Sequence, residues 1–260
     1  MRLITWNINS VRLRLSLLLD LCAAMKPDVV CLQETKCPAE KFPAAPIAEA
    51  GYPHQQIAGF KGYNGVAILS RAPIQDGRIH NHVGREDARH VAGTIEGAEI
   101  HCLYVPAGGD VPDRTENEKF GHKLDFIDTL RDWFPATDAS RRPVLACGDF
   151  NIAPLETDVW SHKQLLKVVS HTPVETEKLT AMQQAAPFTD AVRTFIPPEE
   201  KLFTWWSYRA RDWRASDRGR RLDHIWVTEP LRPALRGAEV MKDARDWQPA
   251  SDHVPVILDL

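Results

Sequence analysis

The sequence lacks the features that mark membrane-spanning, disulfide-stapled and strongly basic proteins. No uncharged apolar stretch approaches the roughly 18 residues that a membrane span requires, and Asn7 and Asn9 interrupt the N-terminus before a signal-type segment develops. The five cysteines include no C-x-x-C pair, which indicates neither a disulfide framework nor a zinc knuckle. We therefore expect a soluble, cytoplasmic protein whose cysteines are reduced thiols, most of them small core residues.

The sequence also lacks an excess of one charge. Its 35 acidic and 32 basic side chains leave a net charge of −3, so charge alone does not indicate a nucleic-acid partner. A composition of 43% hydrophobic and 26% charged residues is that of a globular protein and argues against disorder or a coiled coil. The length favours one layered α/β unit, and we expect a single domain over residues 1–260.

Short apolar, β-rich runs recur between helical patterns. Strands are predicted over residues 3–8, 29–32, 66–69, 100–105, 144–147, 225–227 and 254–258, and helices over 13–25, 120–134 (ended by Pro135), 161–169 and 175–185. Their spacing is too irregular for repeated βαβ units, and no G-x-G-x-x-G or P-loop occurs. The pattern favours an α/β sandwich of sheets flanked by helices.

Polar side chains stand at the ends and starts of these predicted strands. They are Asn7, Asn9, Gln33, Glu34, Tyr104, Asp149, Asn151, Asp223, His224, Ser251, Asp252 and His253. Because the end of one strand and the start of its antiparallel neighbour share one edge of a sheet, these groups can converge.

The converging groups favour one kind of metal. A set of carboxylate and amide oxygens suits Mg²⁺ or Mn²⁺ and not zinc, and a single carboxylate such as Glu34 can hold Mg²⁺ directly. Asn and Asp are also common turn formers, so any one of these residues alone is compatible with a structural role. Glu34 and Asp149 follow apolar runs directly, where a carboxylate needs a partner or a metal. The hypothesis of a metal site therefore depends on all of these residues together and not on any one of them.

A basic and aromatic segment covers residues 201–221. Seven basic and two acidic side chains give it a charge of +5, and five aromatic residues lie between them. Such a mixture suits contact with phosphates and unstacked bases. The alternative is a solvated arginine-rich loop whose tryptophans belong to the core.

Six motifs, in their order along the chain, resemble those of one family. They are Ile4-Thr5-Trp6-Asn7-Ile8-Asn9, Leu32-Gln33-Glu34-Thr35-Lys36, Tyr104-Val105-Pro106, Gly148-Asp149-Phe150-Asn151, Arg221-Leu222-Asp223 and Ser251-Asp252-His253. On these residues the sequence resembles the exonuclease III type of apurinic/apyrimidinic endonucleases, within the larger endonuclease/exonuclease/phosphatase superfamily. The motifs span the chain, and their order makes the signal more specific than any single one.

The resemblance implies a fold and an activity. The fold would be a four-layer α/β/β/α sandwich of two mixed, mainly antiparallel sheets, with the site at the sheet edge. The activity would be Mg²⁺-dependent hydrolysis of DNA 5′ to an abasic sugar, with Mn²⁺ as a substitute, together with removal of nucleotides or blocking groups such as phosphate from 3′ ends. The partner would be double-stranded DNA with abasic sites or 3′ ends, with no membrane involved, and we expect a monomer.

The resemblance also implies roles for the motif residues. Glu34 with Asn7 would hold the metal, and Asp252 would support it through its outer coordination shell. Asp149 would deprotonate or orient the attacking water with help from Asn151.

Other residues would contact the DNA. His253, oriented by Asp223, would contact the phosphate oxygens, and Tyr104 would contact the phosphate near the leaving group. Lys36 is a further candidate for a phosphate contact. Trp205 matches an aromatic residue in the wall of the family's abasic-sugar pocket.

Three positions bear on how closely the chain follows the family. Ala107 stands where relatives usually carry an Asn or Gln that can contact DNA, so this position offers no polar side chain for such a contact. Arg220 replaces a Leu or Trp of the sugar pocket, and our hypothesis is that it contacts DNA and alters the balance between abasic-site incision and exonuclease action. Asn9 matches bacterial relatives, whereas some eukaryotic members carry Asp there, which weakens the case for a second metal at that position.

Two other functions remain open at this stage. A phosphodiesterase or phosphatase for lipid headgroups or inositol phosphates would use the same metal and His-Asp chemistry, although the segment over residues 201–221 favours DNA. A DNA-binding scaffold that lost catalysis is opposed by the complete set of polar motif residues.

Overall fold

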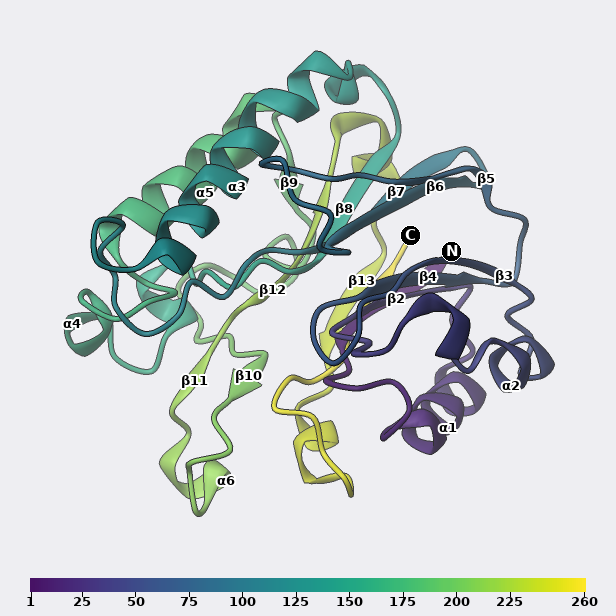
Figure 1. Ribbon diagram of the computed structural model, residues 1–260, viewed down its shortest axis with the longest axis horizontal. Coiled ribbons are helices and arrows are strands. Elements are labelled where there is room, and N and C mark those ends of the chain that lie inside the picture. Colours follow the sequence, from purple (N-terminus) through teal and green to yellow (C-terminus); the bar gives the residue numbers. More distant parts are fainter.

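Two six-stranded sheets form the centre of the computed structural model, which describes residues 1–260 (Figure 1). The first sheet has the order β13 (Gly237–Val240), β14 (Val256–Asp259), β1 (Arg2–Asn7), β2 (Val29–Gln33), β4 (Val66–Ser70) and β3 (His54–Ala58). The second has the order β5 (Gln75–Ile79), β6 (His90–Ile95), β7 (Ala98–Tyr104), β8 (Val144–Asp149), β12 (Asp223–Val227) and β9 (Thr189–Asp190). Each sheet contains one parallel pair, β1 with β2 and β7 with β8, and is otherwise antiparallel.

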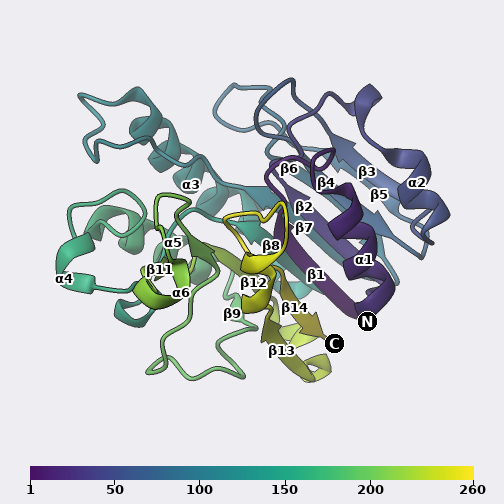
Figure 2. The same ribbon diagram turned by 90° about the horizontal axis from the view of Figure 1, so that it is seen from below.

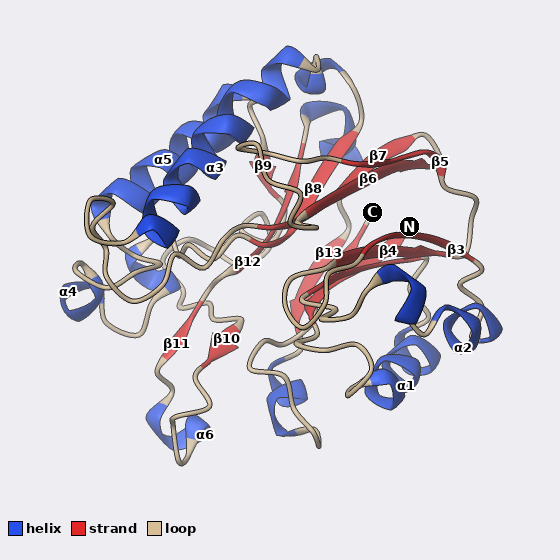
Figure 3. Ribbon diagram, viewed as in Figure 1, coloured by secondary structure: helices blue, strands red, loops and turns tan.

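Helices cover the outer face of each sheet, as Figure 3 shows. α1 (Leu15–Met25) and α2 (Ala44–Glu49) lie on the first sheet, and α3 (Glu118–Ala136) and α5 (Pro173–Ala185) lie on the second. The remaining helices, α4 (His162–Leu165) and α6 (Trp213–Ser216), are short. The predicted four-layer α/β/β/α sandwich is therefore confirmed.

The apolar runs fit this layering because successive side chains of a strand face opposite sides of the sheet, and both sides are covered. In β2, Val29 and Cys31 point between the two sheets, whereas Val30 and Leu32 pack on the side of α1. A strand buried on both faces has no polar side to alternate with, which is why these runs are continuously apolar. All five cysteines are buried and free, as expected. No helix is long and apolar enough to cross a lipid bilayer.

The helices differ from the predicted ones mainly at their ends. α3 runs one residue past Pro135, and its last turn is closed by the backbone N–H of Thr137. Only His162–Leu165 of the predicted helix over 161–169 is helical, because the chain then turns and the N–H of Val168 bonds back to Leu165. α5 begins earlier than predicted, at Pro173, where a capping box between Thr172 and Glu175 starts the helix.

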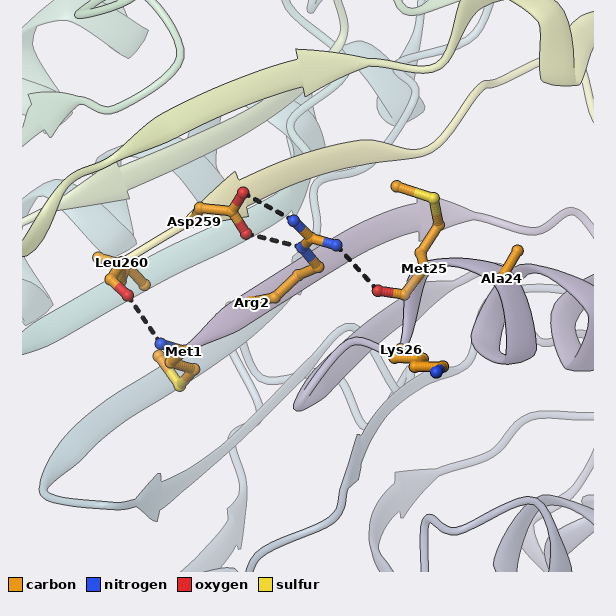
Figure 4. Close-up of a pocket in the computed structure, with 7 residues that line it drawn as sticks. All are labelled: Met1, Arg2, Ala24, Met25, Lys26, Asp259 and Leu260. Atoms are coloured by element: carbon orange, nitrogen blue, oxygen red, sulfur yellow. Dashed lines mark hydrogen bonds and ion pairs between the residues drawn. The ribbon is translucent and has the colours of Figure 1, made fainter.

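The two ends of the chain lie side by side at the edge opposite the loops that carry the polar motifs. The Met1 amino group donates to the carbonyl of Leu260 at 2.7 Å, and the Arg2 guanidinium pairs with Asp259 and donates to the carbonyl of Met25 (Figure 4). These contacts close β1 against β14 and α1, and they line a shallow pocket remote from the motif residues.

Candidate active site

The polar residues that end the strands meet at one edge of the sandwich. Asn7 ends β1 and Glu34 follows β2, whereas Tyr104 and Asp149 end the parallel pair β7 and β8 and are partners in register. β12 runs antiparallel to β8, so its first residue, Asp223, lies opposite Asp149. The predicted convergence of these side chains is present.

A hairpin brings the last two residues of the cluster into place. β10 (Trp205–Trp206) pairs with β11 (Gly219–Arg220), and the β10 strand also lies along the segment before β14. The N–H of Trp206 donates to the carbonyl of Asp252 at 2.9 Å, which fixes Asp252 and His253 at the same edge. Figure 2 views the molecule from this side and shows the hairpin beside the loop that precedes β14.

Glu34 is the carboxylate on which most contacts converge. Its Oε1 accepts hydrogen bonds from Asn7 Nδ2 at 2.9 Å and from the Tyr104 hydroxyl at 3.0 Å, and its Oε2 lies 2.8 Å from Lys36 Nζ. Burial acts to raise the pKa of Glu34, but the Lys36 charge and the Asn7 hydrogen bond outweigh it and lower the pKa below its ordinary value. Glu34 has φ +51°, a left-handed conformation that a non-glycine residue adopts only where the surroundings impose it.

Asp149 is held by amide donors on both oxygens. The Asn151 N–H donates to Oδ1 at 2.8 Å, and Asn7 Nδ2 and Asn151 Nδ2 donate to Oδ2 at 2.9 and 3.2 Å. The preceding Gly148 has φ +136°, and a Cβ there would lie 2.0 Å from the carbonyl oxygen of Leu103. Glycine is therefore required for the chain to deliver Asp149 to this point.

His253 links the two aspartates of the neighbouring strands. Its Nδ1 lies 2.8 Å from Asp223 Oδ2, and its Nε2 lies 3.6 Å from Asp149 Oδ2. The Thr204 hydroxyl also donates to Asp223 Oδ2, at 2.6 Å, and so holds that carboxylate toward the imidazole.

Burial and neighbouring charges shift the pKa values of both Asp149 and His253. Burial raises the pKa of Asp149 to about 7; the charge of His253 opposes the rise and that of Asp223 adds to it. For His253, burial acts to lower the pKa, but the carboxylates of Asp223 and Asp149 outweigh burial and raise it to about 10. At neutral pH the imidazole is a cationic donor, whereas Asp149 can take up and release a proton.

A chain of hydrogen bonds connects Asp252 to Glu34. Asn9 Nδ2 donates to Asp252 Oδ1 at 2.9 Å, and Lys36 Nζ bridges Asn9 Oδ1 and Glu34 Oε2 at 2.6 and 2.8 Å. The other oxygen of Asp252 accepts the Trp205 indole N–H at 3.0 Å. Burial opposes ionisation of Asp252, but the His253 charge and these hydrogen bonds lower its pKa.

These residues supply the oxygen donors that a hard divalent cation needs. Glu34 and Asp149 share the Asn7 amide as a donor, and Asp252 is linked to Glu34 through Asn9 and Lys36. Glu34 Oε2 already holds the ammonium of Lys36, a position that suits a cation. Asn7 presents its amide nitrogen to the two carboxylates, whereas ligation would use Oδ1, which accepts the Asn9 N–H at 3.1 Å. The ligand role of Asn7 therefore stays a prediction.

The cluster opens into a cavity of about 610 Å³. Glu34, Tyr104, Asn151, Asp252 and His253 form one side of it, and its other walls include Trp160, Val169, Trp205, Arg209, Arg218, Arg220 and Ala107. The cavity thus joins the carboxylates and His253 to aromatic and cationic walls.

Arg220 is fixed within this wall. Its guanidinium lies 5.3 Å from the centre of the Trp205 ring and donates to the carbonyl of Val169 at 2.9 Å and the hydroxyl of Ser170 at 2.7 Å. Its Nε is buried and has no partner. Arg220 therefore reaches across the pocket to the chain between α4 and α5, and does not extend into solvent.

The basic and aromatic segment over residues 201–221 divides into two parts. Arg209, Arg218 and Arg220 face the cavity, whereas Arg214 pairs with Asp243 and Asp246 and the buried Arg221 pairs with Asp190 and Asp158. Phe203, Trp206 and Trp213 belong to a small apolar core. The alternative of a structural role is thus correct for several residues, because hairpin pairing turns them away from the cavity.

Two buried residues that hold the site have no place among the predicted site residues. Thr204 orients Asp223, and the Lys123 ammonium on α3 donates to the carbonyls of Asn151 at 2.8 Å and Ala107 at 3.3 Å while pairing with Glu175. A signal for Lys123 was available, because it stands on the apolar stripe of the predicted helix, where a charge must find a buried partner.

Comparison with known proteins identifies what this chain is similar to. Residues 4–253 match the model of the Endonuclease/Exonuclease/phosphatase family. The exodeoxyribonuclease of Bacillus subtilis is 30% identical over 267 residues, covering 99% of this chain and 98% of that protein. Among solved structures, an AP endonuclease from Archaeoglobus fulgidus aligns with a TM-score of 0.92 at 30% identity, over 99% of this chain and 98% of the other. The 3′ phosphatase NExo from Neisseria, bound to a product DNA hairpin, aligns equally well, with a TM-score of 0.92 at 30% identity over 100% and 99% of the two chains.

Proposed function

Because the chain belongs to the Endonuclease/Exonuclease/phosphatase family, we propose that it is a DNA repair nuclease of the exonuclease III and AP endonuclease type. The observation that carries the proposal is the grouping of three residues beside a cavity walled by tryptophans and arginines: Glu34 and His253 line the cavity, and the buried Asp149 lies behind His253. The substrate is double-stranded DNA with abasic sites or 3′ ends, and residues 1–260 act as one domain and as a monomer.

The mechanism follows from the two protonation states of the Asp149 and His253 pair. Asp149, steadied by Asn7 and Asn151, takes a proton from the water that attacks phosphorus. The His253 imidazolium, kept cationic by Asp223, donates to the phosphate oxygens as they gain negative charge.

Tyr104 acts on the leaving-group side of the phosphate. Burial, followed by the charges of Glu34 and Asp149, raises the pKa of Tyr104 well above its usual value, so the residue stays a hydroxyl donor. The guanidinium of Arg89 stacks over the Tyr104 ring at 4.8 Å and limits its movement. Lys36, which pairs with Glu34, contributes a further phosphate contact, and Trp205 contributes a sugar contact from the cavity wall.

Glu34 is the principal metal ligand in this proposal, with Asn7 beside it and Asp252 supporting it from outside. Mg²⁺, or Mn²⁺ in its place, would supply positive charge to the phosphate and lower the pKa of bound water. With a cation on Glu34, the Lys36 ammonium, which also donates to Asn9 Oδ1, would be available to a phosphate.

We predict that catalysis requires the divalent cation. A labelled duplex that carries one abasic analogue and a recessed 3′ end reports incision and 3′ trimming as separate bands. Both are expected with Mg²⁺, both are expected to disappear with excess chelator, and both should return when Mg²⁺ or Mn²⁺ is added in excess. Activity that persists in chelator contradicts the metal role, and a protein that gives neither band with Mg²⁺ overturns the proposed function.

We also predict that Arg220 sets the balance between the two activities. Arg220→Leu removes the guanidinium from the Trp205 face and from Val169 and Ser170, which opens the sugar side of the cavity. The ratio of abasic-site incision to 3′ trimming is therefore expected to rise several-fold in the assay above. Arg236→Leu, at an exposed arginine beside Asp259 and away from the cavity, serves as the matched control and should keep the parent ratio. An unchanged ratio in Arg220→Leu contradicts the prediction.

A further inference from the structure

Four histidines gather on the outer face of the second sheet, beneath α3. His80 follows β5, His82 lies in the next loop, His90 begins β6 and His101 belongs to β7. The rings of all four lie within 6 Å of Trp133 of α3. The active-site residues at the end of β7 lie on the other face of this sheet, so the proposed reaction makes no use of the histidines.

The imidazoles are joined in a directed chain of hydrogen bonds. His82 Nε2 lies 2.8 Å from His90 Nδ1, and His90 Nε2 lies 2.9 Å from His101 Nδ1. At the far end, His101 Nε2 faces Glu99 Oε1 at 3.5 Å. Because Glu99 can only accept when ionised, a consistent arrangement places one proton on each Nε2.

The fourth imidazole, that of His80, lies beside these hydrogen-bonded imidazoles and makes no hydrogen bond of its own. His80 Nε2 is buried and has no partner, and the His80 ring lies 4.6 Å from the His90 ring. One ring nitrogen from each of His80, His90 and His101 lies within 4.8 Å of the other two. Three imidazole nitrogens at this separation can close on one ion after small side-chain rotations.

The chemistry of these donors is suited to a different ion from the one at the carboxylates. Neutral imidazole is a preferred ligand of Zn²⁺, Ni²⁺ and Cu²⁺, whereas Mg²⁺ prefers oxygen. Ligands must be unprotonated to bind, and burial lowers the pKa of His101 to about 3 and that of His90 well below its usual value. These side chains are therefore neutral at physiological pH.

We propose that His80, His90 and His101 form a second metal site, which binds a late first-row divalent cation such as Zn²⁺. His90 Nε2 and His101 Nδ1, which share a hydrogen bond at 2.9 Å, become ligands together with His80. The His90 proton moves to Nδ1, which then donates to His82 Nε2, and the His82 proton moves to its own Nδ1. No proton is gained or lost in this exchange.

Two neighbours support the ligands from outside. His82 accepts from His90, and Glu99 accepts from His101, in the carboxylate–histidine–metal arrangement that orients ligands and raises their basicity. The bound ion would join the β5–β6 loop to β6 and β7. Since only the folded chain brings these residues together, binding raises the melting temperature.

The test uses the full chain with Glu34→Gln, which removes the principal ligand of the other site. The stripped protein is titrated with Co²⁺, whose visible absorption reports coordination by nitrogen ligands, and with Zn²⁺ as competitor. We expect one Co²⁺ per chain, displacement by Zn²⁺ and a higher melting temperature. His80→Ala is expected to weaken binding at least about 100-fold, and Glu99→Gln about 10- to 100-fold.

Controls separate the site from non-specific binding and from misfolding. His54→Ala on β3, in the other sheet, is expected to bind the ion as the parent does. His80 is only partly buried, so His80→Ala should fold and give the circular dichroism spectrum of the parent. Its metal affinity can then be compared directly with that of the parent. Absence of the cobalt spectrum in the parent, or equal affinity in His80→Ala and His54→Ala, overturns the proposal. Neither result bears on the nuclease assay, which concerns the other site.

Discussion

Asp149→Asn is expected to lower turnover on an abasic duplex by at least about 100- to 1,000-fold, within the range of about 10²- to 10⁴-fold that a positioned general base contributes. The amide has nearly the shape of the carboxylate but cannot take a proton from the attacking water. Its NH₂ group can also lie against the donors Asn7 Nδ2 and Asn151 Nδ2, which need an acceptor. The substitution further removes a negative charge that raises the pKa of His253.

His253→Ala is expected to show a loss of the same size for the complementary reason. It removes the cation that meets the phosphate and leaves Asp223 buried, with the Thr204 hydroxyl still donating to it. The measurement is the initial rate with Mg²⁺ in excess, alongside a melting curve for each variant.

The matched control is Asp76→Asn, at an exposed carboxylate of β5 in a left-handed conformation that Asn tolerates. It should keep the parent rate. If purified, folded Asp149→Asn or His253→Ala cleaves at nearly the parent rate, the assignment of the proton acceptor and phosphate donor is wrong.

Lys123→Met is expected to lower the free energy of unfolding by about 3–5 kcal/mol, the range for breaking a buried ion pair by removing one partner. The side chains of Lys123 and Glu175 are both fully buried. Without the ammonium, Glu175 keeps its bonds from Ser170 and Thr172 but loses the only opposing charge that pairs with it, and the Asn151 carbonyl loses a donor.

A second variant separates the charge from the packing. In Lys123→Met with Glu175→Gln, no ionised carboxylate remains buried, so part of the lost stability should return. Lys41→Met, at an exposed lysine, is the control and should change the free energy of unfolding by less than about 0.5 kcal/mol. Urea denaturation measures all three, and a loss below about 1 kcal/mol in Lys123→Met contradicts the prediction.

The polar residues at strand ends could be predicted from the sequence because they directly follow or precede the apolar runs that form the strands. A run such as Val144 to Cys147 identifies a buried strand by itself, and the first polar residues after it mark where that strand leaves the core. Pairing rules for strands then bring Asp149, Asp223 and Tyr104 to one edge. The main strands and the sandwich follow from the same patterns and motifs.

Several strands had no such signal. β5 is exposed along its length and has one apolar residue, Ile79, and β9, β10 and β11 have two residues each. Such strands form because a neighbouring backbone offers hydrogen bonds, and the pattern of their own side chains does not predict them. For this reason the position of the hairpin that carries Trp205 to Asp252 was not predictable from its sequence.

The sequence by itself determined the family motifs, the buried strands and the residues at their ends, since each depends on neighbours within a few positions. Only the tertiary structure decided which long polar side chains serve the site. Arg220 and Arg221 are adjacent in sequence, yet one lines the cavity and the other is buried against Asp190. Lys123 and the histidines beneath α3 likewise find partners on other elements. A long side chain can contact a neighbouring strand, helix or loop, so its partner is set by tertiary packing and not by local sequence.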